Sequence, residues 1–422
     1  MAEDQKAGSL IDLVAFAKDA GDQPTSTLKR TLAAIRHHLG MQIAYVSEFT
    51  NGRTIFREVD APGLEALVNV GDSRSLDDVY CRHILEGRLP ELIPDSSLEP
   101  LAAAMPITSA VPIGSHISVP IRLPDGQPYG MFCCVGLEAN PSLNARDLQT
   151  MRAFAELVAF EINRNLEIRK AVEEKRERIG GVISAGQFSI VYQPIWNLRC
   201  QDVVGFECLA RFSANPDRPP DQWFDEAAEV GLGLALELAA IRQALGSLPL
   251  LPDRLHLAVN ASVETIMSGE FLDIVNEVAP GRIVLEITEH TGIGDYAGLL
   301  NALQPLRHRG LKLAIDDAGA GYSSLRHVLN LRPDLIKLDM ELTRNIDLDP
   351  ARRALASALI AFARDTGSCI IAEGVETASE LATLQTLGVE QAQGYFLGRP
   401  LPLDHALALQ WIAPADRAAR VA

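Results

Sequence analysis

The sequence after residue 200 carries acidic side chains at or near the ends of successive short apolar runs. The residues at these positions, with one asparagine and one lysine among them, are Glu207, Asn260, Glu286, Asp316, Asp317, Lys337, Asp339, Glu373 and Glu376. Where such runs are parallel strands, their C-terminal ends meet at one mouth, and like charges that crowd there are costly unless cations neutralise them. An oxygen donor set without Cys or His favours Mg²⁺ or Mn²⁺, and the number of carboxylates suits two ions. Two such ions can clamp an in-line displacement at phosphorus, so the pattern predicts phosphoryl chemistry.

Two basic residues extend this pattern. Lys337 and Asp339 share strand parity, so we expect both side chains to face the interior. A lysine among carboxylates can orient a nucleophilic water or stabilise charge, and Arg211 suits a phosphate oxygen.

Each acidic residue taken alone also has a structural explanation. A single carboxylate at a strand end is usually a helix cap or a surface charge, and for Glu376 alone we favour the cap. For Asp316 and Asp317 alone, a turn and a functional site explain the sequence about equally well. The repetition at strand end after strand end is what favours a functional site.

The elements that would position these residues follow from the pattern after residue 181. Short β-rich runs alternate there with longer helical segments such as 296–308 and 350–364. The runs begin near Phe188, Val203, Leu255, Ile283, Leu311, Leu335, Cys369 and Gln391. This alternation predicts an α/β fold, a (β/α)8 barrel over residues 181–415, followed by a short tail, 416–422.

A different pattern precedes the barrel. After an N-terminal segment, 1–23, residues 24–146 mix helix and strand, with strands at 45–49 and 54–59 around the turn Asn51-Gly52. A second strand pair, 116–123 and 129–135, is joined by Pro124-Asp125-Gly126. We therefore expect an α+β domain with a meandering antiparallel sheet.

One long helix is predicted over residues 147–180, which contain no Pro and no Gly before Gly180. Apolar residues recur there at alternating spacings of three and four; they are Leu148, Met151, Ala155, Val158 and Ile162. This seam predicts pairing with the same helix of a second chain, and hence a homodimer.

Composition excludes several classes of protein. The 422 residues are 47% hydrophobic, enough to bury a core, so most of the chain is not disordered. A net charge of −17 argues against a nucleic-acid polymer as partner. We expect no membrane insertion, because there is neither a run of 18 apolar residues nor a basic, apolar leader at the N-terminus. Six cysteines without zinc spacing or a disulfide framework fit a cytoplasmic protein.

The strand ends lie in the segments Glu207–Arg211, Asn260, Leu285–Glu289, Asp316–Asp317, Lys337–Asp339, Glu373–Glu376 and Gln393–Tyr395. On these segments, residues from about 183 to 412 resemble the EAL-domain cyclic di-GMP phosphodiesterases. The resemblance implies a modified barrel whose first strand is antiparallel to the rest. It also implies an enzyme that hydrolyses one phosphodiester of cyclic di-GMP to give linear pGpG.

The resemblance further implies roles for individual residues. Metal would be held by Glu207, Asn260, Glu286, Asp316 and Glu373, and Asp317 would bind or bridge to the second ion. Lys337 would contact the attacking water, and Glu289 would brace the loop after strand five. The expected catalytic residues are Glu207, Lys337, Glu373 and Glu289. The expected substrate-binding residues are Gln193, Leu209, Arg211, Asp339, Glu376 and Gln393.

Three positions depart from the family's pattern. Cys208 replaces the signature alanine, Phe212 stands where tryptophan is common, and Ala318 stands where the family usually has phenylalanine. We expect the first two to be tolerated and the third to remove an anchor of the loop. No expected metal ligand is missing, so we expect an active enzyme.

The N-terminal part contains the segments Tyr80–Arg82, Gly87–Asp95, Ile113–His116 and Tyr129–Cys134. On these segments it resembles a GAF domain. The resemblance implies a sensor or dimerisation module with an unidentified small ligand. Cys81 and His83 suggest a bilin or metal site, although ordinary pocket or surface residues are the simpler interpretation. No motif for cyclic di-GMP synthesis occurs.

Two other functions remain open from the sequence. One is a non-catalytic receptor that binds cyclic di-GMP in the barrel and signals to a partner. The other is a barrel phosphodiesterase with a different nucleotide substrate.

Overall fold

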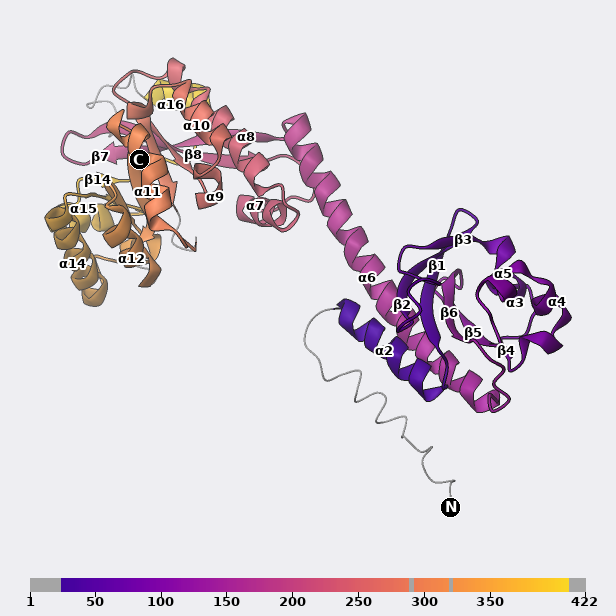
Figure 1. Ribbon diagram of the computed structural model, residues 1–422. Helices are drawn as coiled ribbons and strands as arrows, with labels where there is room; N and C mark the ends of the chain where they lie inside the picture. The colour runs from indigo at the N-terminus through magenta and orange to yellow at the C-terminus, as the bar shows by residue number, and fades with distance from the viewer. Residues whose placement is uncertain (1–23, 288–291, 319–321, 410–422) are drawn as a thin grey trace. The chain divides into compact units, whose positions relative to one another are not determined.

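The computed structural model describes residues 24–287, 292–318 and 322–409, in two compact units, Met1–Lys170 and Ala171–Ala422 (Figure 1). The long helix α6 (Ala145–Ala185) begins in the first unit and ends in the second. It confirms the predicted helix and continues past Gly180 and Gly181. No helix within the described ranges is both long enough and apolar enough to span a membrane.

The N-terminal unit is built on a six-stranded antiparallel sheet in the order β3-β2-β1-β6-β5-β4. Its strands are β1 (Ile43–Thr50), β2 (Arg53–Asp60), β3 (Ser73–Ser75), β4 (Leu92–Ile93), β5 (Ser115–Arg122) and β6 (Pro128–Gly136). Its other helices are α2 (Pro24–His38), α3 (Tyr80–Leu85), α4 (Pro100–Ala104) and α5 (Pro106–Ala110).

Both predicted hairpins are confirmed. Asn51 and Gly52 have φ of 52° and 74°, the left-handed conformation that a two-residue hairpin requires. The sheet is nevertheless not a simple meander, because β6 lies between β5 and β1, with Val135 opposite Ile43. Pairing between strands so distant in the sequence leaves no local signal in the residues.

Apolar layers cover both faces of this sheet. On one face α2 and the first turns of α6 pack on the strands, as the contacts of Leu32 and Phe154 show. On the other face lies α3, through Tyr80. The adjacent residues Cys133 and Cys134 point to opposite layers, as the two-residue period of a strand requires.

We predicted that the α6 seam pairs with the same helix of a second chain, and this prediction is wrong. Met151, Ala155 and Val158 are buried against the sheet and α2 of their own unit, and Leu148 and Ile162 pack beside them. Spacings of three and four describe the buried face of any amphipathic helix, so they could not distinguish a second chain from the chain's own sheet.

The C-terminal unit is a closed eight-stranded barrel in the order β10-β11-β12-β13-β14-β7-β8-β9. The strands are β7 (Phe188–Asn197), β8 (Asp202–Phe212), β9 (His256–Asn260), β10 (Ile283–Ile287), β11 (Lys312–Ala318), β12 (Leu335–Leu338), β13 (Cys369–Ala372) and β14 (Gln391–Ala392). The helices are α7 (Pro220–Glu229), α8 (Gly233–Leu245), α9 (Val263–Ile266), α10 (Gly269–Asn276), α11 (Tyr296–His308), α12 (Tyr322–Leu331), α13 (Met340–Thr343), α14 (Pro350–Thr366), α15 (Ala378–Leu387) and α16 (Leu403–Leu409). Strand β7 is antiparallel to both neighbours, β8 and β14, so the modified barrel is confirmed.

A small apolar plug fills the interior of the barrel below the mouth. Its buried members come from six different strands and are Ile195, Ala258, Val284, Ala314, Leu335 and Ile371. Because side chains alternate along a strand, the residue two positions further toward the mouth also faces the interior. This offset places the functional side chains.

Candidate active site

The side chains at the mouth of the barrel lie two residues beyond the plug residues of the same strands. Two positions beyond the plug residues of β9 to β13 lie Asn260, Glu286, Asp316, Lys337 and Glu373. On β7 the offset runs backwards along the sequence, from Ile195 to Gln193, because that strand is antiparallel. Gln193 is the register partner of Glu207, which lies in the middle of β8. The structure therefore brings these sequence-predicted residues to one mouth.

Lys337 lies at the centre of the carboxylates. Its Nζ is 2.8 Å from Glu286, 2.9 Å from Glu373, 3.1 Å from Asp316 and 3.4 Å from Glu207. The Lys337 side chain is 1% exposed, so no bulk water screens these contacts. We call Glu207, Glu286, Asp316, Lys337 and Glu373 the carboxylate cage.

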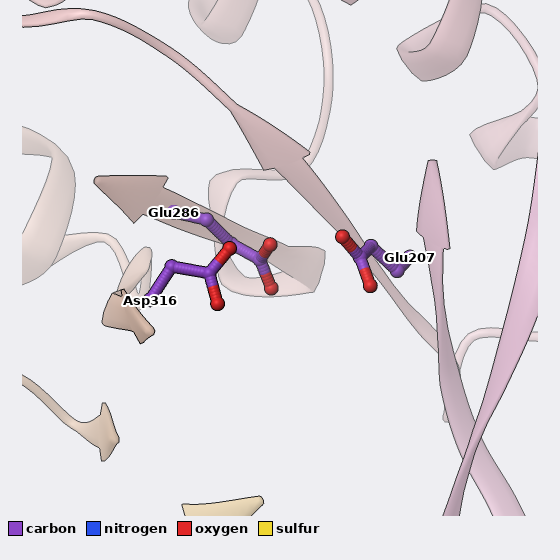
Figure 2. A group of neighbouring side chains, drawn as sticks. All are labelled: Glu207, Glu286 and Asp316. Atoms are coloured by element: carbon purple, nitrogen blue, oxygen red, sulfur yellow. The ribbon is translucent and has the colours of Figure 1, made fainter. Parts of the chain in front are cut away.

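The carboxylate oxygens converge in two overlapping groups. Glu207, Glu286 and Asp316 each offer one oxygen within 4.8 Å of the others, and Figure 2 shows their carboxylates turned toward a common space. Asp316, Asp317 and Glu373 form a second group of the same size. Asp316 thus belongs to both groups.

An irregularity in β11 lets two consecutive aspartates reach the mouth. The register of β11 against β12 shifts between Ile315 and Ala318, and Asp317 has φ of 54°. Successive residues of a regular strand would point to opposite faces. The bulge with its left-handed residue instead keeps Asp317 beside Asp316, whose Oδ1 accepts a hydrogen bond from the Asp317 N–H at 2.9 Å.

Burial and the central ammonium control the charges. Burial raises the pKa of Glu286 and of Glu373 well above the usual range, although Lys337 lowers both. Burial also opposes the charge of Lys337, yet the carboxylates of Asp316, Glu207, Glu286 and Glu373 hold its pKa well above the usual value. The cage is therefore short of positive charge when Lys337 is its only cation.

Gln393 has a role that the sequence did not indicate. Its Nε2 donates to Glu207 at 2.6 Å and to Glu373 at 2.7 Å, so the side chain braces two cage carboxylates instead of only lining the pocket. The next residue, Gly394, has φ of 155°, and a Cβ there would lie 2.2 Å from the backbone nitrogen of Val375. The glycine permits this close approach and so sets the position of Gln393.

A cavity of about 510 Å³ opens next to Asn260, and none of the five cage residues is among those that line it. Its lining includes Leu209 and Arg211 from β8, as expected, and Asn260 from β9. The sequence did not reveal its other wall, which contains Asp221 and Phe224 of α7. Cys208 lines the same cavity and is buried, so the small side chain is accommodated.

Two predicted substrate-binding residues have other partners. Asp339 does not point into the cage with Lys337, because β12 ends at Leu338 and the Asp339 carboxylate caps α13 through the Glu341 N–H. Glu376 pairs with Arg344 at 2.9 Å and is 44% exposed. It is not the helix cap either, since Thr377 caps α15 with Glu380. The predicted bracing residue Glu289 lies outside the described residues.

A family model of the EAL domain matches residues 175–400, more than half of the chain. The chain belongs to the EAL-domain family. The EAL match contains every residue of the cage, and a GAF domain model matches residues 23–162. The N-terminal unit is accordingly a GAF domain.

Several relatives of the EAL-domain chain have been described. An uncharacterised signalling protein of Caulobacter vibrioides is 30% identical over 69% of this chain and 38% of its own length. Cyclic di-GMP phosphodiesterase NbdA of Pseudomonas aeruginosa is 31% identical over 57% of this chain and 32% of its own length. Cyclic di-GMP phosphodiesterase RocR of the same organism is 27% identical over 78% of this chain and 82% of its own length. The chain thus spans under two fifths of the length of the first two relatives.

A solved structure supports the barrel assignment. The MucR phosphodiesterase in complex with cyclic di-GMP is 28% identical, with a TM-score of 0.51, and the match covers 56% of this chain and all of that one. A second solved EAL enzyme, Bd1971, covers 88% of this chain with a TM-score of 0.52 at 19% identity, which shows similarity of fold.

Proposed function

We propose that this chain hydrolyses cyclic di-GMP to linear pGpG. The observation that carries the proposal is the cage, in which two carboxylate groups share Asp316 around one buried lysine. Relatives with the same domain, NbdA and RocR, are named cyclic di-GMP phosphodiesterases. The cavity of about 510 Å³ has the size of a small-molecule site.

The cage residues suit two divalent ions, Mg²⁺ or Mn²⁺. Glu286 Oε1 is buried and has no hydrogen-bond partner among the described residues. The donor set there is oxygen only, which fits hard cations. Glu207, Asn260, Glu286, Asp316, Asp317 and Glu373 would hold the ions, and membership of both groups makes Asp316 the best candidate to be shared. The chemistry that such ions supply when bound is a lowered pKa of water and neutralisation of charge at phosphorus.

The chain's own residues have separable tasks in this reaction. Arg211, on the cavity wall, binds a phosphate oxygen of the substrate. Lys337, inside the cage, orients the attacking water as an ammonium donor, and its charge also offsets that of the carboxylates. Gln393 holds Glu207 and Glu373 at a constant separation. Gln193 and Leu209 are the other residues proposed to contact the substrate.

Product analysis distinguishes this function from its alternatives. The full chain is incubated with cyclic di-GMP and Mn²⁺ or Mg²⁺, and the nucleotides are separated by chromatography. Linear pGpG from the wild type, with none from Glu286→Gln, supports the proposal. Tight binding without turnover would indicate a receptor, and faster turnover of another cyclic nucleotide in a competition panel would indicate a different substrate.

The GAF domain is proposed to bind a small ligand that regulates the barrel. A cavity of about 40 Å³ lies between the sheet and α3, lined by Tyr45, Tyr80 and His116 among others. His116 Nδ1 is buried and has no hydrogen-bond partner within the described ranges. The cavity is smaller than the roughly 150 Å³ that holds a benzene ring, so a larger ligand requires the walls to move. Loss of ligand-induced thermal stabilisation in His116→Phe would support the site.

A cytoplasmic homodimer remains part of the proposal, on a different surface from the seam. Leu157, Phe160 and Ile168 of α6 are 57%, 70% and 54% exposed, and their spacing places them on one helix face. This exposed stripe suits the same stripe of a second chain. Light scattering should give a dimer for the wild type and a monomer for Phe160→Glu, whereas a monomeric wild type would refute this assembly.

A further inference from the structure

Helix α7 has two faces with different partners. Trp223 and Ala227 are buried in a cluster that also holds Ile179 and Val182 of α6, and Glu226 is buried on the same side of α7. Asp221, Phe224 and Asp225 instead line the cavity of about 510 Å³, together with Arg211. The two sets are offset by about half a turn of helix. Helix α7 thus contacts α6 with one face and forms a wall of the cavity with the other.

We propose that Glu226, bound by Arg178 of α6 and by Arg218, is a positioning residue that holds the α7 wall of the substrate cavity. Through Glu226, helix α6 affects the binding of substrate in the cavity and does not affect the carboxylate cage. The inference rests on the proposed function, because the cavity is taken as the cyclic di-GMP site.

The contacts of Glu226 join three segments of the chain. Its Oε1 accepts from Arg178 Nε at 2.9 Å, and its Oε2 pairs with Arg218 Nη1 at 2.5 Å. The Glu226 side chain is 8% exposed and Arg218 is 14% exposed, so this carboxylate sits largely out of water between two cations. Removing one partner of a buried ion pair is strongly destabilising, because the charge of the other partner is left buried and uncompensated.

The same network reaches Phe212, the residue that follows the cavity-lining residues of β8. The Arg218 guanidinium lies 3.9 Å from the ring centre of Trp223, and Phe212 stacks on Trp223 at 5.2 Å. Phe212 directly follows Arg211, the proposed phosphate-binding residue. The packing expected for Phe212 is thus confirmed, and it connects the network to Arg211 from the β8 side.

Helix α6 is held to α7 by further contacts. Arg176 donates to the carbonyl of Val230 at 2.9 Å, and Lys175 pairs with Glu229 at 2.6 Å. Lys175 and Glu229 are 37% and 60% exposed, so their pair joins the same two helices without reaching the cavity. It provides a matched control for the buried network.

The test uses the full chain and two substrates. Cyclic di-GMP requires the cavity wall, whereas bis(p-nitrophenyl) phosphate is a small diester that reports on the cage alone. The variants are Glu226→Gln, Arg178→Met, the conservative Arg178→Lys and the control Lys175→Met. For each, KM and kcat are measured on both substrates, and the dissociation constant for cyclic di-GMP is measured by calorimetry.

We expect Glu226→Gln and Arg178→Met to raise KM and the dissociation constant for cyclic di-GMP roughly five- to thirtyfold, the equivalent of about 1–2 kcal/mol of binding free energy. Their kcat and their hydrolysis of the small diester should stay within about twofold of the wild type. Arg178→Lys should recover part of the loss, and Lys175→Met should behave as the wild type.

Three results overturn the inference. They are an unchanged dissociation constant in Glu226→Gln, an equal loss of kcat on both substrates, and an equal effect of Lys175→Met. If the wild type hydrolyses neither substrate, the proposed function fails separately, and the calorimetric constants alone then decide whether Glu226 positions the cavity wall.

Discussion

The ammonium of Lys337 lies 2.8 Å from a carboxylate oxygen of Glu286, and both side chains are buried. Three further cage carboxylates lie within 3.4 Å of the same nitrogen. A single positive charge thus offsets several negative ones where water cannot screen them.

This arrangement predicts that Lys337 stabilises the chain when metal is withheld. Lys337→Met leaves the carboxylates without a counter-ion, so in EDTA the free energy of unfolding should fall by about 3–5 kcal/mol. Added Mn²⁺ should stabilise the variant more than the wild type. Urea unfolding followed by tryptophan fluorescence measures both quantities, because Trp196 and Trp223, the tryptophans within the described ranges, lie in the C-terminal unit. Equal stability of the two proteins in EDTA would contradict the role.

Gln393 is not a proposed metal ligand, but we expect it to affect the affinity for metal because it holds two of the ligands. Gln393→Ala removes both hydrogen bonds to Glu207 and Glu373, so affinity for Mn²⁺ should fall roughly 10- to 100-fold, as for other groups that orient ligands. Calorimetric titration of Mn²⁺ gives the affinity. Gln385→Ala, on the exposed side of α15, serves as the control. The bracing role is wrong if both variants bind Mn²⁺ like the wild type.

The backbone at Asp317 makes a prediction about stability that is independent of charge. With φ of 54°, the position penalises a side chain with a Cβ and favours glycine. Asp317→Gly should therefore be more stable than Asp317→Ala by about 1 kcal/mol, although both lose the carboxylate. Unfolding of the two variants in EDTA tests this, and the opposite order would show that the bulge is not strained.

His256 gives the barrel a pH dependence. Burial, with a smaller contribution from Lys312, lowers the pKa of His256 to about 4. The unfolded chain binds this proton near pH 6.5, so between about pH 6.5 and 4 the unfolded state holds more protons, and stability falls as the pH falls. The loss attributable to His256 reaches about 3 kcal/mol at pH 4. His256→Leu should flatten this part of the urea-derived stability profile, and an unchanged slope would exclude His256 as the cause.

The sequence could predict the barrel and the cage because both depend on regular features. Apolar runs mark the strands, and strand parity carries a side chain such as Glu286 or Lys337 to the interior two positions beyond a plug residue. Strand parity failed for Asp339 because β12 had already ended. Strand parity also does not place Asp316 and Asp317 side by side, because their arrangement depends on a bulge in β11.

Other features could not be predicted because they depend on contacts between distant segments. The bond from Gln393 to Glu207 joins residues 186 positions apart. The α6 seam was correctly identified as apolar, but a period of 3.6 residues does not name the surface that covers it. The role proposed for Glu226 depends on Arg178 and Arg218, which lie 48 and 8 positions away in the sequence.

The most direct test of the account joins metal binding to chemistry in one titration. Metal-free chain is titrated with Mn²⁺ in the presence of cyclic di-GMP, and bound Mn²⁺ and pGpG are measured on the same samples. The account predicts about two ions per chain, with pGpG formation rising as they bind, and a loss of both in Asp316→Asn, since Asp316 belongs to both carboxylate groups. Formation of pGpG that persists in Asp316→Asn or without bound Mn²⁺ would contradict it.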